Sequence, residues 1–542
     1  MGNLSSHETV ETLREYQDPY NFESYDDWVA PISNDEQFLR KWNRLVLKKL
    51  ELADNDAFCH VFGNVARENG ENGYWSEQTF IKFFANKTKR LHTTMQEAKL
   101  WYDLVLRLGS YPYISNPPPG RHPQLDFLTF KCGLMALSGR LTGTTPIASG
   151  FKFGGTAGRK RRRILFVALQ EDVREPLTPE DEMTKTRTEE DDEDLDDVIK
   201  LFGEYRWEGP NPCLTYQGPM IPHRTAFRSS RSVPNGMVKV ERIWQLLERL
   251  LMVKLWCFGI DLEAPTVKAL DWSGVIEVVM ASGGIDPSTP RGYVQWPEFD
   301  RMFATIPRAS ESLGPLFKSF ISPSPNNAID NTATTQKQNA FISHHLTHPP
   351  GTILTLPILA QILSSTWSHS LYTTPPLNAP SLATHKLEYT GPLSTFESFL
   401  SQLPPSTRTR KQTLIMIEGA TLTTNKPFTG GIYLNNNLDE FTTSFVFQTR
   451  PINRSFAADR EPGEPEHAER MSFCRDKGML ETVVRTCNGV GSCATMSLQM
   501  RGGRFGALRW EWGGDRDGDE VGNEEFSVGV IEYISFGRGI RV

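Results

Sequence analysis

Apolar residues recur at intervals of three and four between residues 35 and 140 and again between 237 and 320, the spacing that buries one face of an α-helix. Gly and Pro clusters separate these segments, so the pattern predicts a group of short helices. The predicted helical segments are Gln37–Leu52, Asp56–Asn69, Ser76–Ala85, Thr94–Leu108, Leu125–Leu137 and Trp244–Ile260. In the last segment, Glu248, Arg249 and Lys254 form a charged face, which favours a buried amphipathic helix.

A different pattern follows in the last third of the chain. After one or two helices beginning near Gly351, short runs rich in Ile, Val, Phe, Tyr and Trp are bounded by Gly, Asn and Asp, which is typical of β-strands. The predicted strands are Thr413–Glu418, Thr429–Leu434, Ser444–Thr449, Thr495–Arg501, Gly506–Trp512 and Phe526–Phe536. Because no segment of helical length alternates with them, an antiparallel β-sandwich is favoured over a parallel sheet. The expected fold class is therefore α+β.

Changes in composition divide the chain into six regions. Gly-rich Gly150–Gly158, the basic run Arg159–Arg163 and the acidic run Glu189–Asp194 predict a long, partly disordered loop between two helical regions. A stretch rich in Ser, Thr, Asn and Pro predicts a linker before the strands. The predicted regions are an N-terminal segment at 1–34, a helical region at 35–138, the long loop at 139–236, a second helical region at 237–325, the linker at 326–350 and a sheet domain at 351–542.

Composition narrows the class of protein. The net charge of −7 argues against a dedicated nucleic-acid binder, and a hydrophobic content of 38% excludes a globally disordered chain. Seven cysteines and the lack of a basic-then-apolar signal sequence at the start indicate a reducing, intracellular setting. The longest run without charged residues, Gln338–His385, contains several His and many Pro, Ser and Thr, so we expect no transmembrane helix.

The first residues carry a lipidation signal. Met1-Gly2-Asn3-Leu4-Ser5-Ser6 fits the pattern for N-myristoylation, with Gly2 as the acceptor. One myristoyl chain gives only reversible membrane binding, so a second contact is needed. Arg159–Arg163 is one candidate, because basic residues are attracted to anionic lipid surfaces. A protein partner already on the membrane is another, and the basic run is also compatible with a solvated patch or a nuclear-import sequence.

Two short segments resemble the second half of a calcium-binding EF-hand loop: Asn72–Phe80 and Arg291–Phe299. Calcium needs oxygen ligands at loop positions 1, 3 and 5 and a bidentate Glu at position 12. In the later segment the early positions are Pro287, Thr289 and Arg291, and in the earlier one position 12 is Thr79. We therefore expect helix pairs that keep their packing and bind no metal.

The sequence offers no catalytic constellation that we could identify, so we expect no catalytic residues and no cofactor. Cys474, Cys487 and Cys493 lack the C-x-x-C spacing of a zinc site. The pair Cys59-His60 is more typical of a helix core than of a catalytic dyad, and His344, His345 and His348 lie beside the linker without nearby carboxylates. The strand carboxylates are Glu418, Glu511 and Glu532, each compatible with catalysis or with a buried hydrogen-bond network.

The order of motifs after residue 350 resembles a TLDc domain. The lead-in helix is Ile353–Leu363, and the motifs that follow are Leu371-Tyr372, Ser394–Glu397, Leu414–Gly419, Gly430–Tyr433, Ser444–Phe447 and Phe526–Gly537. The last of these is similar to the terminal strand of that family, a hydrophobic run with an internal Glu. Two stretches depart from the pattern: Tyr372–Thr395 is Pro-rich, and Arg460–Cys493 is polar and is interpreted as an insertion between strands.

The arrangement of the whole chain, with Gly2, EF-hand-like helices and a C-terminal TLDc domain, is similar to the fungal restriction of telomere capping protein 5 family. It also resembles animal TLDc proteins that associate with lysosomes. This resemblance implies a non-enzymatic regulator that binds the vacuolar proton-pumping ATPase and promotes its disassembly. It further implies a cytoplasmic protein peripherally associated with the vacuolar membrane, with links to oxidative-stress resistance and an indirect link to telomere capping.

Three alternatives remain open at this stage. A thiol-based oxidative-stress protein would use Cys487 or Cys493, which lie in a Gly-rich stretch. A lipid-anchored scaffold would be unrelated to the pump. A nuclear factor would bind nucleic acid directly through Arg159–Arg163, but the acidic run that follows makes a poor surface for DNA.

Overall fold

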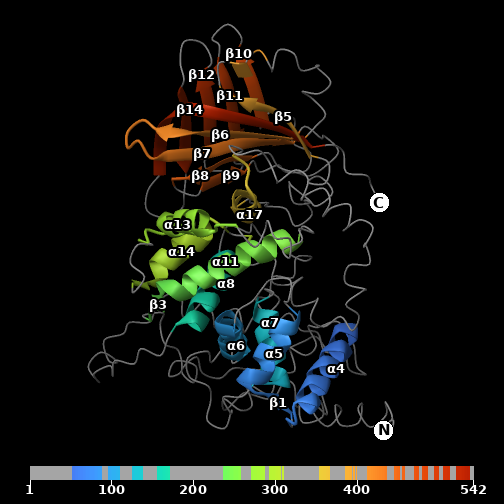
Figure 1. The fold of residues 1–542 in the computed structure, drawn as a ribbon. Helices are drawn as coiled ribbons and strands as arrows, with labels where there is room; N and C mark the ends of the chain where they lie inside the picture. The colour runs from blue at the N-terminus through green and yellow to red at the C-terminus, as the bar shows by residue number, and fades with distance from the viewer. Residues whose placement is uncertain are drawn as a thin grey trace, which may run out of the picture.

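The chain folds into helices followed by an antiparallel sheet (Figure 1), a mixed α+β architecture. The structure is a computed structural model. The residues it describes are 52–71, 73–87, 95–109, 125–137, 156–170, 236–257, 270–286, 292–306, 308–309, 353–365, 385–392, 395–396, 398, 412–435, 445–451, 454–457, 469–474, 479–485, 493–499, 505–512 and 520–536.

The first group of helices is built from two helix–strand–helix units. Strand β1 (Tyr74–Trp75) pairs antiparallel with β2 (Leu125–Asp126), and Trp75 lies opposite Leu125. The helices on either side of these strands are α4 (Leu52–Glu68), α5 (Glu77–Lys87), α6 (Met95–Gly109) and α7 (Phe127–Leu137). The two-residue sheet therefore joins units that are distant in sequence.

The second group repeats this arrangement. Strand β3 (Val238–Lys239) pairs antiparallel with β4 (Tyr293–Val294), and Val238 lies opposite Val294. The flanking helices are α8 (Thr156–Leu169), α11 (Val240–Cys257), α13 (Ser273–Ser282) and α14 (Trp296–Ala304). In Figure 1 this group lies between the first group and the sheet.

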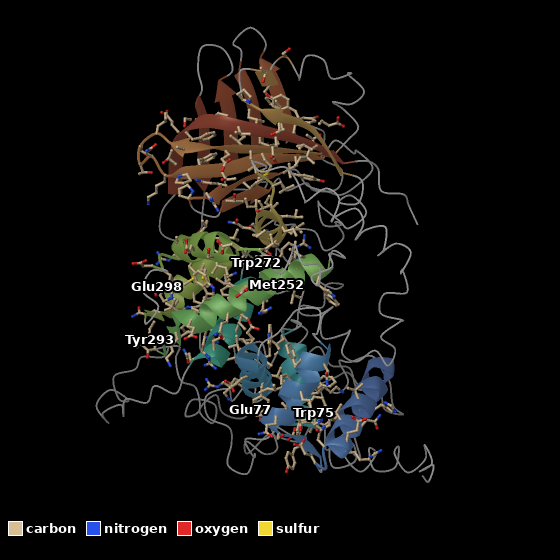
Figure 2. All side chains as sticks on the ribbon, viewed as in Figure 1. Trp75, Glu77, Met252, Trp272, Tyr293 and Glu298 are labelled. Carbon is tan, nitrogen blue, oxygen red and sulfur yellow. The ribbon has the colours of Figure 1, made fainter. Side chains whose placement is uncertain are left out.

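Aromatic side chains fill both groups. Trp75 is fully buried, its ring stacks on Phe62 with centroids 4.8 Å apart, and its indole N–H donates to the Phe62 carbonyl at 3.0 Å (Figure 2). In the second group, Phe166 packs against Trp296 and Phe299 at 5.6 and 5.1 Å. Such contacts add to the burial of apolar area, the main force that holds the helices together.

The sheet contains ten strands, and every described pair is antiparallel, as predicted. Its order is β10-β11-β12-β13-β14-β6-β7-β8-β9, with β5 also paired to β14. The strands are β5 (His385–Gly391), β6 (Gln412–Thr421), β7 (Pro427–Asn435), β8 (Phe445–Arg450), β9 (Arg454–Ala457), β10 (Glu469–Cys474), β11 (Met479–Arg485), β12 (Cys493–Gln499), β13 (Phe505–Trp512) and β14 (Glu520–Phe536).

Strand β14 organises the sheet. Along one edge it pairs with β6, and along the other it pairs first with β13 and then, from Ile531 onward, with β5. Both faces of β6 are buried between Thr413 and Ile417. On one face, Leu414 and Met416 join the same apolar core as the helices.

The six predicted strands are confirmed: five agree within three residues at each end, and β14 begins six residues before its predicted start. Strands β10 and β11 lie within Arg460–Cys493 and pair with each other, although no strand was predicted there. Strand β5 also lies in the Pro-rich stretch where no strand was predicted. The predicted helix Gln37–Leu52 lies outside the described residues except for Leu52, which begins α4.

Candidate functional site

Glu532 is a buried carboxylate in β14, with 1% of its surface exposed. One carboxylate oxygen accepts a hydrogen bond from the backbone N–H of Ile353 at 2.6 Å, and the other accepts from Leu354 N–H at 3.1 Å. Burial raises the pKa of this carboxyl group above its ordinary value, the two N–H donors act against that rise, and the charge of Glu418 adds to it.

The two hydrogen bonds join the beginning and the end of the C-terminal region. Ile353 and Leu354 come just before helix α17 (Leu356–Ser365), and Glu532 lies in the last strand. The carboxylate therefore satisfies backbone donors at the entrance to a buried helix, where an unpaired N–H would be costly. The geometry makes Glu532 an anchor for α17.

Helix α17 connects the sheet to the second helical group (Figure 1). All ten of its residues are buried. On the sheet side, Gln361 Nε2 donates to the Thr449 carbonyl at 3.1 Å. On the helical side, the Ser364 carbonyl accepts from Arg308 N–H at 3.0 Å, and the Arg308 carbonyl accepts from Lys254 Nζ at 3.1 Å. Polar contacts in buried surroundings fix register as well as stability, so the helices and the sheet are connected by specific bonds.

A carboxylate also lies in the loop of the first helix–strand–helix unit. Glu71 accepts hydrogen bonds from the Thr79 hydroxyl at 2.8 Å and from Ser76 N–H at 3.2 Å. Ser76 in turn donates from its hydroxyl to Thr79 Oγ1 at 3.1 Å. The polar groups of this loop thus bond to one another and fix the start of α5 through side-chain capping.

In the last helix–strand–helix unit, formed by α13, β4 and α14, a different carboxylate stabilises the start of the second helix. Glu298, in the first turn of α14, accepts from Gln295 N–H at 2.8 Å and forms a capping box with Gln295 (Figure 2). A capping box satisfies two donors at a helix start. The Glu298 carboxylate is therefore engaged in a hydrogen bond to the backbone of its own helix start.

Two ion pairs connect the first helical group to the second. Arg249 of α11 bonds to Glu97 of α6, and both side chains are buried. Arg242, nearer the start of α11, bonds to Asp103 of α6 at 2.8 Å. Burial raises the pKa of the neighbouring Glu248, an effect that Arg249 opposes and Glu97 reinforces. These pairs hold α6 and α11 together at two points.

The basic run proposed as a membrane contact belongs to a helix. Arg159–Arg163 lies in α8, although the sequence analysis placed it in a long loop. Arg162 pairs with Asp300 of α14 at 2.7 Å, and Arg163 is buried. At least these two residues serve packing between helices.

The remaining residues singled out from the sequence are dispersed. Cys59 is buried in α4, while His60 is exposed and bonds to Asn64 at 3.2 Å. Glu418 is exposed on β6, and Glu511 and Cys493 lie in β13 and β12. The other residues fall outside the described part of the chain: Gly2, His344, His345, His348 and Cys487. Three further carboxylates were not predicted from the sequence. Glu71 bonds to Ser76 and Thr79 within its own helix–strand–helix unit, whereas Glu97 and Asp103 bond to residues of a distant helix.

The described residues contain no cluster of three or more His, Cys, Asp or Glu able to hold a metal ion. Within the same residues, none of the helices combines the length and the apolar character needed to cross a membrane. Comparisons of the chain with family models, curated proteins and solved structures gave no match.

Proposed function

We propose that the protein is a non-enzymatic regulator that binds the vacuolar proton-pumping ATPase and promotes its disassembly. The observation that carries the proposal is the bond between Glu532 and the start of α17. The TLDc resemblance rests on a lead-in helix and a terminal strand with an internal Glu, and these two motifs meet through that Glu. This bond supports the proposal that residues 351–542 form one domain.

Two further features support the finer architecture we propose. A β-sandwich is favoured because β8 contacts β12 and β9 contacts β11, although these strands are far apart in the order of the sheet. The helix–strand–helix units are proposed to be EF-hand-like without metal. Gly73, Gly236 and Gly292 each come two residues before the paired strand residue, where an EF-hand loop needs its turn, and Gly73 has a φ of +75°.

A non-enzymatic role is favoured because the buried carboxylates that we found are engaged in structural bonds. Glu532 anchors α17, and Glu97 pairs with Arg249. Neither arrangement leaves the carboxylate positioned against an open site of the kind that acid–base chemistry uses. The thiol alternative depends on Cys487 and Cys493, whose side chains the structure does not describe.

Membrane association is proposed to depend on a myristoyl group at Gly2. Because Arg162 and Arg163 serve contacts between helices, the basic run is a weaker second contact than a protein partner already at the vacuolar surface. The expected location is cytoplasmic, with peripheral association with that membrane. Replacing Gly2 with Ala should move the protein to the supernatant of fractionated cells and leave its thermal unfolding unchanged.

The turn between β6 and β7 is our candidate for contact with the pump. Residues 422–427 are exposed, and Leu422 has 44% of its surface accessible. The turn is held by Thr421, whose hydroxyl accepts from Lys426 N–H at 3.0 Å and bonds to the Thr424 hydroxyl at 2.6 Å. An ordered turn that presents an apolar side chain loses little entropy on binding.

The test uses vacuolar membranes with assembled pump. Full-length protein is added, and release of the peripheral ATPase sector is measured by pelleting alongside ATP hydrolysis. We expect release with the wild type, at least a tenfold weaker effect with Leu422→Asp, and no change with Tyr293→Asp, a matched variant at an exposed residue of strand β4 (Figure 2). Absence of both release and binding with the wild type would contradict the proposed function, whereas equal activity of the two variants would exclude only the turn.

A further inference from the structure

Four positions in the helical groups are equivalent. The strand pairing places Trp75 opposite Leu125 and Val238 opposite Val294. The residues four places after these lie in the first turn of the following helix; they are Thr79, Thr129, Arg242 and Glu298. In a calcium-binding EF-hand this position holds the bidentate Glu, and the bound cation connects the loop to the helix that follows it.

Arg242 places a positive charge at this position. Its Nη1 donates to the carbonyl of Leu169 at 3.1 Å, and its Nη2 donates to Asp103 Oδ2 at 2.8 Å. Leu169 is the last residue of α8, the helix that precedes this loop. Carbonyls at a helix C-terminus lack partners within the helix and carry partial negative charge, so they attract a cation. Arg107 of α6 donates to the next carbonyl, that of Gln170.

The carbonyls that Arg242 and Arg107 contact lie at the start of the chain segment that connects α8 to β3. Gln170 and Gly236 touch, because a Cβ added to Gly236 would lie 2.5 Å from the Gln170 side chain. In sequence, residues 171–235 separate them, in place of the short run that would supply the first ligands of a calcium loop. Bringing the ends of a longer chain segment together costs more entropy, so a direct bond between α8 and α11 offsets part of that cost.

We propose that the Arg242 guanidinium takes the place of a bound cation in the third unit. It connects the end of α8 to the start of α11, and Asp103 orients it. This role rests on the EF-hand-like identification of the units, and it is independent of any binding to the pump. The other units close through their own side chains, as Glu71 does with Thr79 and Glu298 with Gln295.

Hydrogen–deuterium exchange, followed by mass spectrometry on full-length protein, tests this role. Replacing Arg242 with Met should speed exchange in the last turn of α8 about tenfold or more, because a charge-assisted hydrogen bond is lost. Arg242→Lys should give a smaller increase, since a single ammonium does not span both partners as the guanidinium fork does. Arg301→Met is the matched control, because Arg301 is exposed and bonds only within α14 in the contacts described for it.

A second set of exchange measurements tests the role of Asp103 in orienting the Arg242 guanidinium and the independence of this contact from calcium. Asp103→Asn should raise exchange at the same turn less than Arg242→Met, because the bond to Leu169 remains. Exchange in the wild type should be the same in calcium and in a calcium chelator. The proposal is overturned if Arg242→Met behaves like Arg301→Met, or if calcium slows exchange at the end of α8 in the wild type.

Discussion

The two helical groups have the same arrangement of helices and short paired strands, but their loops close through different chemistry. In the first group, Glu71 accepts from the Thr79 hydroxyl and from Ser76 N–H, so a carboxylate satisfies one hydroxyl and one backbone donor. In the second, Arg242 and Glu298 bond to the ends of helices. The arrangement therefore depends on the apolar core and the strand register. Different sets of polar contacts near the helix starts are compatible with it.

The groups also differ in how densely aromatic rings surround the central tryptophan. Trp75 packs against four Phe rings, and Trp296 has two described ring contacts. We expect Trp75→Ala to lower the free energy of unfolding by about 4–5 kcal/mol and Trp296→Ala by about 3 kcal/mol. Urea unfolding measures both. The opposite order would contradict the comparison, and Tyr293→Ala, at an exposed ring, should change little.

The buried ion pair between the groups provides the next largest effect. Arg249→Met leaves the Glu97 carboxylate buried without its partner and should destabilise the protein by about 3 kcal/mol. The double variant with Glu97→Met should recover most of that loss, because both charges are then removed. Chemical denaturation of the single and double variants measures the coupling. Lys99→Met, in an exposed pair with Glu77, is the control and should cost under about 1 kcal/mol. A double variant no more stable than the single would contradict this account.

The loop of the first unit should respond more weakly. Thr79→Val keeps the shape of the side chain and removes the hydroxyl that bonds to Glu71, so we expect a loss of about 1 kcal/mol. Thermal unfolding measures the loss. Calcium should not restore stability to this variant, and recovery in calcium would show that the loop retains a metal site.

The smallest expected effect is a change in stability with pH, and it comes from Glu532 in strand β14 of the sheet. Because the pKa of Glu532 is raised in the folded protein, the folded state holds its proton more tightly than the unfolded state. The contribution of Glu532 to stability is greatest below pH 4.5, the ordinary pKa of a Glu carboxyl group. Stability then falls as the pH rises from there through the raised pKa of Glu532. In Glu532→Gln, the urea midpoint should depend less on pH across this range, because the contribution of this carboxyl group is removed.

Glu525→Gln is the matched control for the pH experiment, because Glu525 is exposed on the same strand. Its midpoints should follow those of the wild type. If Glu532→Gln kept the full slope, the folded and unfolded states would hold a proton at this carboxyl group with equal affinity.

The sequence alone determined the elements whose signal is local. Helices at Asp56–Asn69 and Thr94–Leu108 followed from apolar spacing, and the strand at Thr413–Glu418 followed from its apolar and β-branched residues. The predicted lack of calcium ligands also came from residue types at fixed places in a loop, and it stays a prediction. Strands β10 and β11 were missed because the polar residues around them dominate the stretch 460–493, although β11 itself contains the β-branched residues Thr482, Val483 and Val484.

Only the tertiary structure decided the partners of the charged residues. Nothing near Glu532 in sequence indicates that it meets Ile353, and Arg242 is far along the chain from Leu169 and Asp103. The basic run at Arg159–Arg163 looked like a surface patch, but burial of Arg163 and the bond of Arg162 to Asp300 assign two of its residues to helix packing. Charge alone does not specify a partner. Folding brings distant groups together, and the cost of burying a charge then selects those that can be paired.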